Sequence, residues 1–159
     1  MPYLIDGNNF IGYLPTLEIK SPESRYELIS RLIIFQKVKH TRVMVVFDGP
    51  PDPNLIDEDF KGMSFYVLYP DFGQDADTVI KKIISKETDL RQFFVVSSDR
   101  EIKFFAKSKG AKSLNCQEFN KQLKKALKRY KKIMELEKNV EFPSPLEVKF
   151  WSKIFERKK

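Results

Sequence analysis

A short apolar run at residues 3–5 ends abruptly in an acid, a glycine and two amides, Asp6-Gly7-Asn8-Asn9. Such a run is typical of a strand that is buried on both faces, as in a parallel sheet. Asp6 would then lie at the carboxyl end of the strand, the edge where open α/β sheets bind ligands. Gly7 permits a sharp turn and a close approach, and the two amides can bind a substrate or orient the acid. An ordinary polar turn after a strand is the alternative.

The same pattern recurs along the chain and alternates with segments of helical periodicity. Further strands are predicted at residues 42–49, 63–69, 92–101 and 111–115. Helices are predicted at residues 21–38, 76–84, 102–109 and 116–133, and residues 10–15 read as a loop or a short helical turn. Strands that alternate with helices predict an α/β fold, in which helices cover both faces of a mostly parallel sheet of about five strands.

Composition limits the class of protein. A chain of 159 residues with 42% hydrophobic residues is expected to form one globular domain with a real core. No apolar run approaches the roughly 20 residues of a membrane span, and no signal peptide is recognisable. Cys116 is the only cysteine, which excludes an internal disulfide and a cysteine-based zinc site and favours a cytoplasmic location. The only histidine, His40, lies in a polar stretch and is interpreted as a surface residue.

Four acids are expected to meet at one edge of the sheet. Asp6, Asp48 and Asp99 are each placed at the end of a predicted strand, and Asp77 lies in the first turn of the helix after the third strand. Clustered carboxylates repel one another, and a divalent cation relieves this repulsion. Carboxylate and amide ligands suit Mg²⁺ or Mn²⁺, one or two ions, which can activate water against a phosphodiester. The alternative for each single acid is a helix cap, a role predicted for Asp75.

Other phosphate and hydrolase chemistries lack their motifs. The sequence contains no GxxxxGK[ST] loop, no GxGxxG after the first strand and no G-x-S-x-G elbow. A phosphatase that forms an aspartyl-phosphate usually needs a second acid two residues after the first, where this chain has Asn8.

Four short blocks resemble the signature motifs of NYN domains, a branch of the PIN-like nucleases. They are Asp6-Gly7-Asn8-Asn9, Phe47-Asp48-Gly49, Asp75-Ala76-Asp77 and Ser97-Ser98-Asp99-Arg100. Their order and spacing are most similar to those of the bacterial YacP-like subgroup, over roughly residues 2 to 120. The resemblance implies a three-layer α/β/α PIN-like fold and metal-dependent, usually endonucleolytic, cleavage of RNA.

The resemblance also implies roles for individual residues. Asp6, Asp77 and Asp99 would be the main metal-associated acids, with Asp48 as a further participant. Asn9 would orient the site or contact a phosphate, and Asp75 would support the metal ligands. Asn8, Ser98 and Arg100 are the expected substrate contacts beside these acids. Many PIN relatives have a further acid near the position of Asp99, whereas here Arg100 and Glu101 follow. Whether Glu101 contributes to the site, or Arg100 contacts RNA there instead, stays open.

Charge is distributed unevenly along the chain. Residues 1–99 hold 11 Lys and Arg against 15 Asp and Glu, a net charge of −4, whereas residues 100–159 carry a net charge of +11. The predicted helix after residue 116 is dense in cations that helical spacing places partly on one face. Those expected to contact a phosphate backbone are Lys124, Lys125, Lys128 and Arg129. Solvated lysines without a ligand are the alternative.

These observations predict a nuclease domain at residues 1–135, followed at residues 136–159 by a linker and a helix that packs on the same domain. The predicted function is a metal-dependent endoribonuclease with RNA (mRNA, tRNA or rRNA) as substrate and the translation machinery as a candidate partner, away from membranes. A PIN-like module that binds RNA or a ribonucleoprotein without cleaving it is the first alternative. A DNA-directed nuclease of the flap type is the second, although the chain is short for that family.

Overall fold

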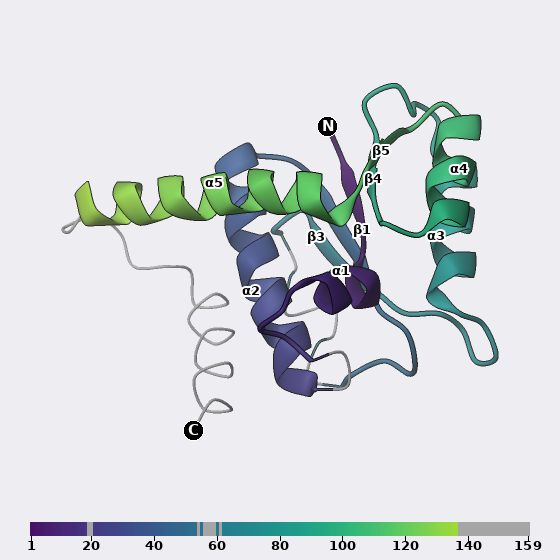
Figure 1. Ribbon diagram of the computed structural model, residues 1–159, viewed down its shortest axis with the longest axis horizontal. Coiled ribbons are helices and arrows are strands. Elements are labelled where there is room, and N and C mark those ends of the chain that lie inside the picture. Colours follow the sequence, from purple (N-terminus) through teal and green to yellow (C-terminus); the bar gives the residue numbers. More distant parts are fainter. Residues whose placement is uncertain (19–20, 54, 56–59, 61, 137–159) are drawn as a thin grey trace.

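The computed structural model describes residues 1–18, 21–53, 55, 60 and 62–136, in which strands and helices alternate (Figure 1). The strands are β1 (Tyr3–Asp6), β2 (Val43–Val46), β3 (Phe65–Leu68), β4 (Phe94–Val96) and β5 (Lys112–Leu114). The helices are α1 (Gly7–Tyr13), α2 (Pro22–Lys39), α3 (Ala76–Lys86), α4 (Arg100–Ser108) and α5 (Cys116–Leu136). The helix predicted near the C-terminus and the linker before it lie outside the described residues.

The five strands form one sheet, in the order β3-β2-β1-β4-β5, and all neighbouring strands are parallel. The predicted α/β fold is therefore confirmed, with a sheet that is wholly parallel. From β1 the chain moves outward through β2 to β3, and it then returns to the other side of β1 to form β4 and β5. The order thus reverses between β1 and β4, and in open α/β sheets ligands bind at the carboxyl edge beside such a reversal.

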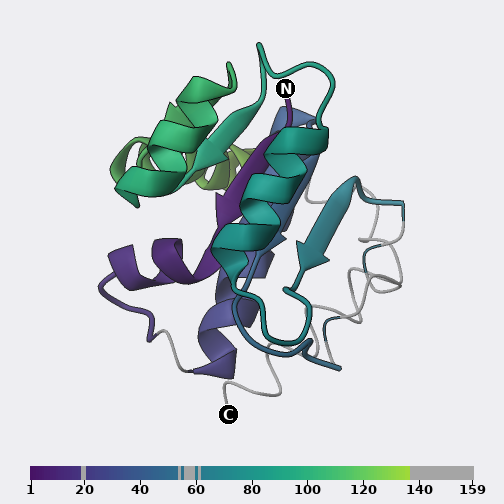
Figure 2. The same cartoon turned by 90° about the vertical axis from the view of Figure 1, so that its right-hand side faces the viewer.

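Helices cover the sheet on both faces, with α1, α2 and α5 on one face and α3 and α4 on the other (Figures 1 and 2). Successive side chains of β1 point to opposite faces of the sheet. Tyr3 and Ile5 pack against α2 and α5, and Leu4 packs against α3 and α4. Because β1 and β2 are buried along their whole length, they read as continuous apolar runs in the sequence.

Aromatic side chains pack together on the face of the sheet that α1, α2 and α5 cover. The rings of Phe35 and Phe119 lie edge to face with centroids 5.1 Å apart, and the Phe10 ring meets Phe119 at 5.5 Å. The Tyr3 ring contacts Phe35 at 5.0 Å. These contacts join α1, α2 and α5 to the central strand, and edge-to-face pairs of this kind add to the stability that burial supplies.

Helix α5 packs on the domain only through its first half. Phe119, Leu123 and Ala126 are buried, whereas Met134 and Leu136 are exposed where the helix extends past the sheet (Figure 1). Among the residues that the structure describes, no helix combines the length and the hydropathy that crossing a membrane requires.

Candidate metal centre

The strand β1 passes directly into α1, so that Asp6 ends the strand and Gly7 begins the helix. A Cβ atom on residue 7 would lie 2.6 Å from the ring of Phe47 and 2.9 Å from the carbonyl oxygen of Val46. The close approach predicted at Gly7 is thus made by the end of β2. Residues 10–13, predicted as a loop or a short helical turn, belong to α1.

Asp6 is a buried acid, with 6% of its surface exposed. Its Oδ2 accepts a hydrogen bond from the Ser97 hydroxyl at 3.1 Å, and it makes no side-chain cap to α1. Burial, together with the smaller effects of the charges of Asp77 and Asp48, raises the pKa of Asp6 to about 6, against the lowering effects of the Ser97 hydroxyl and the Asn9 backbone. Asp6 therefore lies within electrostatic reach of two of the acids that the sequence placed beside it.

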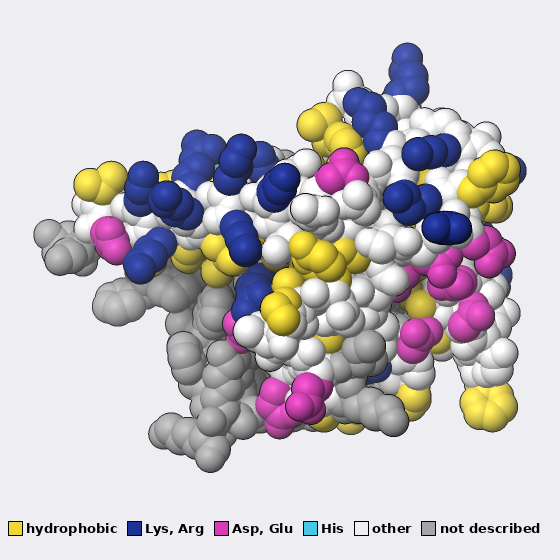
Figure 3. All heavy atoms as spheres, viewed as in Figure 1, with side chains coloured by type: hydrophobic (Ala, Val, Ile, Leu, Met, Phe, Trp, Pro, Cys, Tyr) yellow, Lys and Arg dark blue, Asp and Glu magenta, His cyan; other side chains and the backbone are white. Residues whose placement is uncertain are grey.

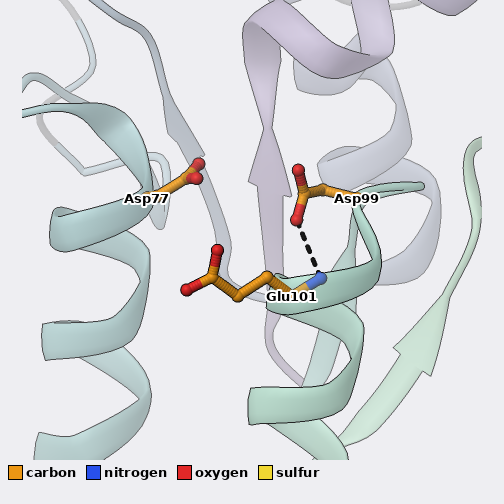
Figure 4. A group of neighbouring side chains, drawn as sticks. All are labelled: Asp77, Asp99 and Glu101. Atoms are coloured by element: carbon orange, nitrogen blue, oxygen red, sulfur yellow. Dashed lines mark hydrogen bonds between the residues drawn. The ribbon is translucent and has the colours of Figure 1, made fainter.

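Three carboxylates meet between α3 and α4. One oxygen from each of Asp77, Asp99 and Glu101 can be chosen so that all three lie within 4.8 Å of one another. Figure 4 shows Asp77 pointing from the start of α3 toward Asp99 and Glu101 at the start of α4. Two of the predicted metal-associated acids are thus brought together, and Glu101 joins them. Asp6 and Asp48 are not members of this three-residue group.

The two helices begin with the same pattern of an acid, one residue and a second acid. In α3 the first acid, Asp75, caps the helix by accepting from the Thr78 N–H at 2.9 Å. In α4 the first acid, Asp99, accepts through Oδ1 from the N–H groups of Glu101 (2.9 Å) and Ile102 (3.2 Å). The second acids, Asp77 and Glu101, then face each other across the gap between the helices.

This parallel explains how Glu101 could have been found from the sequence. Asp75-Ala76-Asp77 and Asp99-Arg100-Glu101 both place an acid at the helix cap and another two residues later. Once α3 and α4 are known to lie side by side on one face of the sheet, the second acids become neighbours. The role of Glu101 stayed open because the acids were expected to meet through their strand ends and, for Asp77, through the first turn of a helix.

The group carries more negative charge than its surroundings balance. Partial burial raises the pKa of Asp77 above its usual value, and the charges of Asp99, Asp75 and Asp48 add to this increase. Among the described residues, the cation that forms a salt bridge with the group is Lys81, whose Nζ lies 2.6 Å from Oε1 of Glu101. A bound cation would lower the pKa of Asp77 by relieving the repulsion that raises it.

Asp48 connects two elements at this edge. Its Oδ1 accepts from the N–H of Ala76, the first residue of α3, at 2.9 Å, and its own N–H donates to Oδ1 of Asn8 at 3.0 Å. Its side chain is exposed and holds the start of α3 beside the end of β2. The predicted role of Asp48 as a metal ligand stays a prediction.

The two asparagines join strand ends. Asn9 accepts through Oδ1 from the N–H of Ser98 at 2.9 Å and from the thiol of Cys116 at 3.1 Å, so that it links α1 to the end of β4 and the start of α5. The Ser98 hydroxyl accepts from the Cys116 N–H at 3.1 Å. These bonds support an orienting role for Asn9, while the substrate contacts predicted for Asn8 and Ser98 stay predictions.

The predicted phosphate contacts lie outside the group of acids: Arg100 adjoins it on α4, whereas α5 packs on the opposite face of the sheet. Arg100 is exposed at the first position of α4, beside Asp99 and Glu101. The cations of α5, Lys124, Lys125, Lys128 and Arg129, are all exposed. Figure 3 shows Lys and Arg side chains along α5 and over α4, with acidic side chains gathered below α4.

The donor set fits a hard divalent cation. The ligand atoms are all carboxylate oxygens, the class that Mg²⁺ and Mn²⁺ prefer. Helix capping accounts for Asp75 and Asp99, but it does not account for Asp6, Asp77 or Glu101. Asp77, Asp99 and Glu101 are therefore the residues whose oxygens lie close enough together to hold such an ion, and the role of Asp6 as a metal ligand stays a prediction.

A family model described as the YacP-like NYN domain matches residues 3–157. The chain belongs to this family. The fold is also similar to a crystal structure of Rae1 (YacP) from Bacillus subtilis, in its W164L mutant, with a TM-score of 0.70 at 23% identity over 94% of this chain and 90% of that one. A second crystal structure of Rae1 (YacP) matches with a TM-score of 0.68, also at 23% identity, over 85% of this chain and 80% of that one. No curated protein matches the chain.

Membership confirms the predicted family, and the structural matches confirm the fold. The NYN domain implies a nucleic acid as the general class of ligand. The structure adds an acidic group, Asp77, Asp99 and Glu101, that could bind a metal ion.

Proposed function

We propose that this protein is a metal-dependent endoribonuclease that hydrolyses RNA phosphodiester bonds with one or two Mg²⁺ or Mn²⁺ ions. The observation that carries the proposal is the group formed by Asp77, Asp99 and Glu101, whose ligand oxygens lie within 4.8 Å of one another beside buried Asp6. Membership in the YacP-like NYN family supports a nucleic acid as the substrate. Binding alone would not benefit from carboxylates that repel a phosphate backbone.

The acids have separate roles in this proposal. Asp77, Asp99 and Glu101 would hold the cation, which would supply a nucleophilic water and neutralise charge on the phosphate. Asp6 lies deeper and adds negative charge that favours a cation at this edge. Ser97 fixes its carboxylate through the 3.1 Å hydrogen bond.

Further residues keep the acids in place and hold the RNA. Asn9 ties α1 to the residue before Asp99, and Asp48 fixes the start of α3, which carries Asp77. Arg100 and the cations of α5 would contact phosphates on either side of the scissile bond. The translation machinery as a partner and a cytoplasmic location remain predictions from the sequence.

The test is cleavage of an internally labelled single-stranded RNA in Mn²⁺ and in EDTA, with RNA binding followed by gel shift on the same samples. Two variants, Asp77→Asn and Glu101→Gln, are compared with the control Asp89→Asn, an exposed acid that pairs with Arg91 away from the site. We expect internal cuts in Mn²⁺ only, a loss of at least about a hundredfold for Asp77→Asn, and full activity for the control.

Retained binding by inactive Asp77→Asn would separate catalysis from RNA recognition. Binding without cutting in any divalent metal would contradict the proposal and favour the non-cleaving module. Preferential cutting of branched DNA would favour the flap-type nuclease.

A further inference from the structure

Helix α4 presents three faces with different side chains. Ile102 and Ala106 are buried against the sheet. Glu101 and Phe105 face α3, because Lys81 of α3 pairs with Glu101 at 2.6 Å and lies 5.7 Å from the centre of the Phe105 ring. The third face is formed by the remaining positions at i, i+3, i+4 and i+7, which helical geometry places together: Arg100, Lys103, Phe104 and Lys107.

Phe104 lies on this third face, away from both core clusters. Its side chain is 76% exposed, although the core-facing positions of the same helix are fully buried. The neighbouring Phe105 differs, since it packs against the second core cluster and has the ammonium groups of Lys81 and Lys109 within 6 Å of its ring centre. The ring of Phe104 therefore adds almost no buried apolar surface to the core, so it does not stabilise the fold in this way.

The cations around Phe104 form no salt bridge within the described part of the chain. Arg100 and Lys107 are exposed and form no salt bridge with any residue that the structure describes. Lys103 is half-buried beside them. Lys81, by contrast, is engaged by Glu101. Figure 3 shows Lys and Arg side chains over α4, with acidic side chains below them.

Position connects this face to the proposed metal centre. Arg100 stands between the acids Asp99 and Glu101, and α4 rises by about 1.5 Å per residue, so Phe104 lies about 5 Å along the axis from Glu101. An aromatic ring among cations is the surface that binds a single strand, because bases stack on the ring while the cations hold the phosphates. A duplex offers no free base face to such a ring.

We propose that the face of α4 formed by Arg100, Lys103, Phe104 and Lys107 is a stacking site for an unpaired base of a single-stranded nucleic acid whose backbone leads to the Asp77, Asp99 and Glu101 group. The part of this inference that rests on the proposed function is the path of the nucleic-acid strand toward the acids. It specifies that the substrate is unpaired where it contacts α4, and it makes Phe104 a positioning residue.

A second exposed aromatic residue provides the matched control. Phe72 is fully exposed in the loop before α3, but its charged neighbours in the loop are the acids Asp71 and Asp75. A phosphate backbone is repelled there, so Phe72 is expected to bind no base.

The experiment measures the binding of full-length protein in EDTA, where the proposed metal centre cannot act, to a fluorescent oligouridylate and to a fluorescent RNA duplex. Phe104→Ala is expected to weaken binding of the single strand about tenfold and to leave the duplex unchanged. Phe104→Trp should retain the affinity, and Phe72→Ala should bind as the wild type does. Phe104→Ala should leave the salt dependence unaltered, whereas Arg100→Gln should reduce its slope by about one phosphate contact.

Three results would overturn the inference. The first is an unchanged affinity of Phe104→Ala for the oligouridylate. The second is an equal loss on the single strand and the duplex, and the third is a change in oligomeric state, since that would assign the ring to contact between copies. Because binding is read without metal, the stacking site can fail while the nuclease stands, and the nuclease can fail while the stacking site stands.

Discussion

The buried carboxyl group of Asp6 destabilises the folded protein when it is ionised. Its folded pKa of about 6 exceeds the value of about 3.9 expected in the unfolded chain. Between these values the folded protein keeps a proton that the unfolded chain has released. The free energy of unfolding therefore falls as pH rises from about 4 to about 6, and the loss is complete at pH 7.

Replacing this carboxyl group should remove the loss. In EDTA at pH 7, Asp6→Asn is expected to raise the free energy of unfolding by up to about 3 kcal/mol, and at pH 4 the two proteins should be alike. Urea denaturation at both pH values measures the difference. Asp89→Asn is the control, because hydrogen bonds from Arg91 lower the pKa of Asp89 and its removal should bring no gain at pH 7. Equal stability of Asp6→Asn and wild type at pH 7 would contradict the account.

Gly7 is required by packing. A methyl group there would meet the Phe47 ring at 2.6 Å, so Gly7→Ala is expected to lower the free energy of unfolding by about 1–3 kcal/mol. The control is Gly12→Ala in the same helix, at an exposed position, where alanine should be neutral or stabilising. Denaturant titration of both variants tests this, and equal effects would show that the fit against Phe47 is not the cause.

At the scale of elements, periodicity predicted the helices well and their starts less well. Ser21 and Pro22 predicted the start of α2, and Asp75 predicted the start of α3. These starts can be predicted because capping depends on residues close together in the sequence. The start of α1 at Gly7 was not predicted, and the close contact with Phe47 from a distant strand explains only why residue 7 is a glycine. The role of Glu101 was left open because its partner Asp77 is 24 positions away and becomes a neighbour only when α3 and α4 lie together.

The basic helix α5 gives a prediction of its own. If its exposed cations hold a phosphate backbone, Lys124→Gln combined with Lys128→Gln should weaken RNA binding and reduce the slope of log affinity against log salt by nearly two contacts. Binding at several salt concentrations measures this slope. Lys39→Gln with Lys86→Gln, at the ends of α2 and α3, removes the same charge elsewhere and should leave the slope unchanged. Equal slopes for both pairs would show that net charge alone matters.

At the scale of the whole molecule, parallel pairing brings the acids to one edge. Every strand of the sheet runs in the same direction, so residues that follow strands in the sequence meet at its carboxyl edge. This rule predicted that Asp6, Asp48, Asp77 and Asp99 would gather. It could not predict which of them share an ion, because that depends on helix positions to within an ångström or two.

The most direct test of the metal centre is a titration of Mn²⁺ into EDTA-treated and dialysed protein, with the rate of RNA cleavage measured on the same samples. We predict that the rate rises in step with bound Mn²⁺, and that Asp77→Asn loses both binding and cleavage while Asp89→Asn retains them. Cleavage at full rate in EDTA, or binding of Mn²⁺ by Asp77→Asn with the affinity of the wild type, would contradict the assignment of the Asp77, Asp99 and Glu101 group as the metal centre.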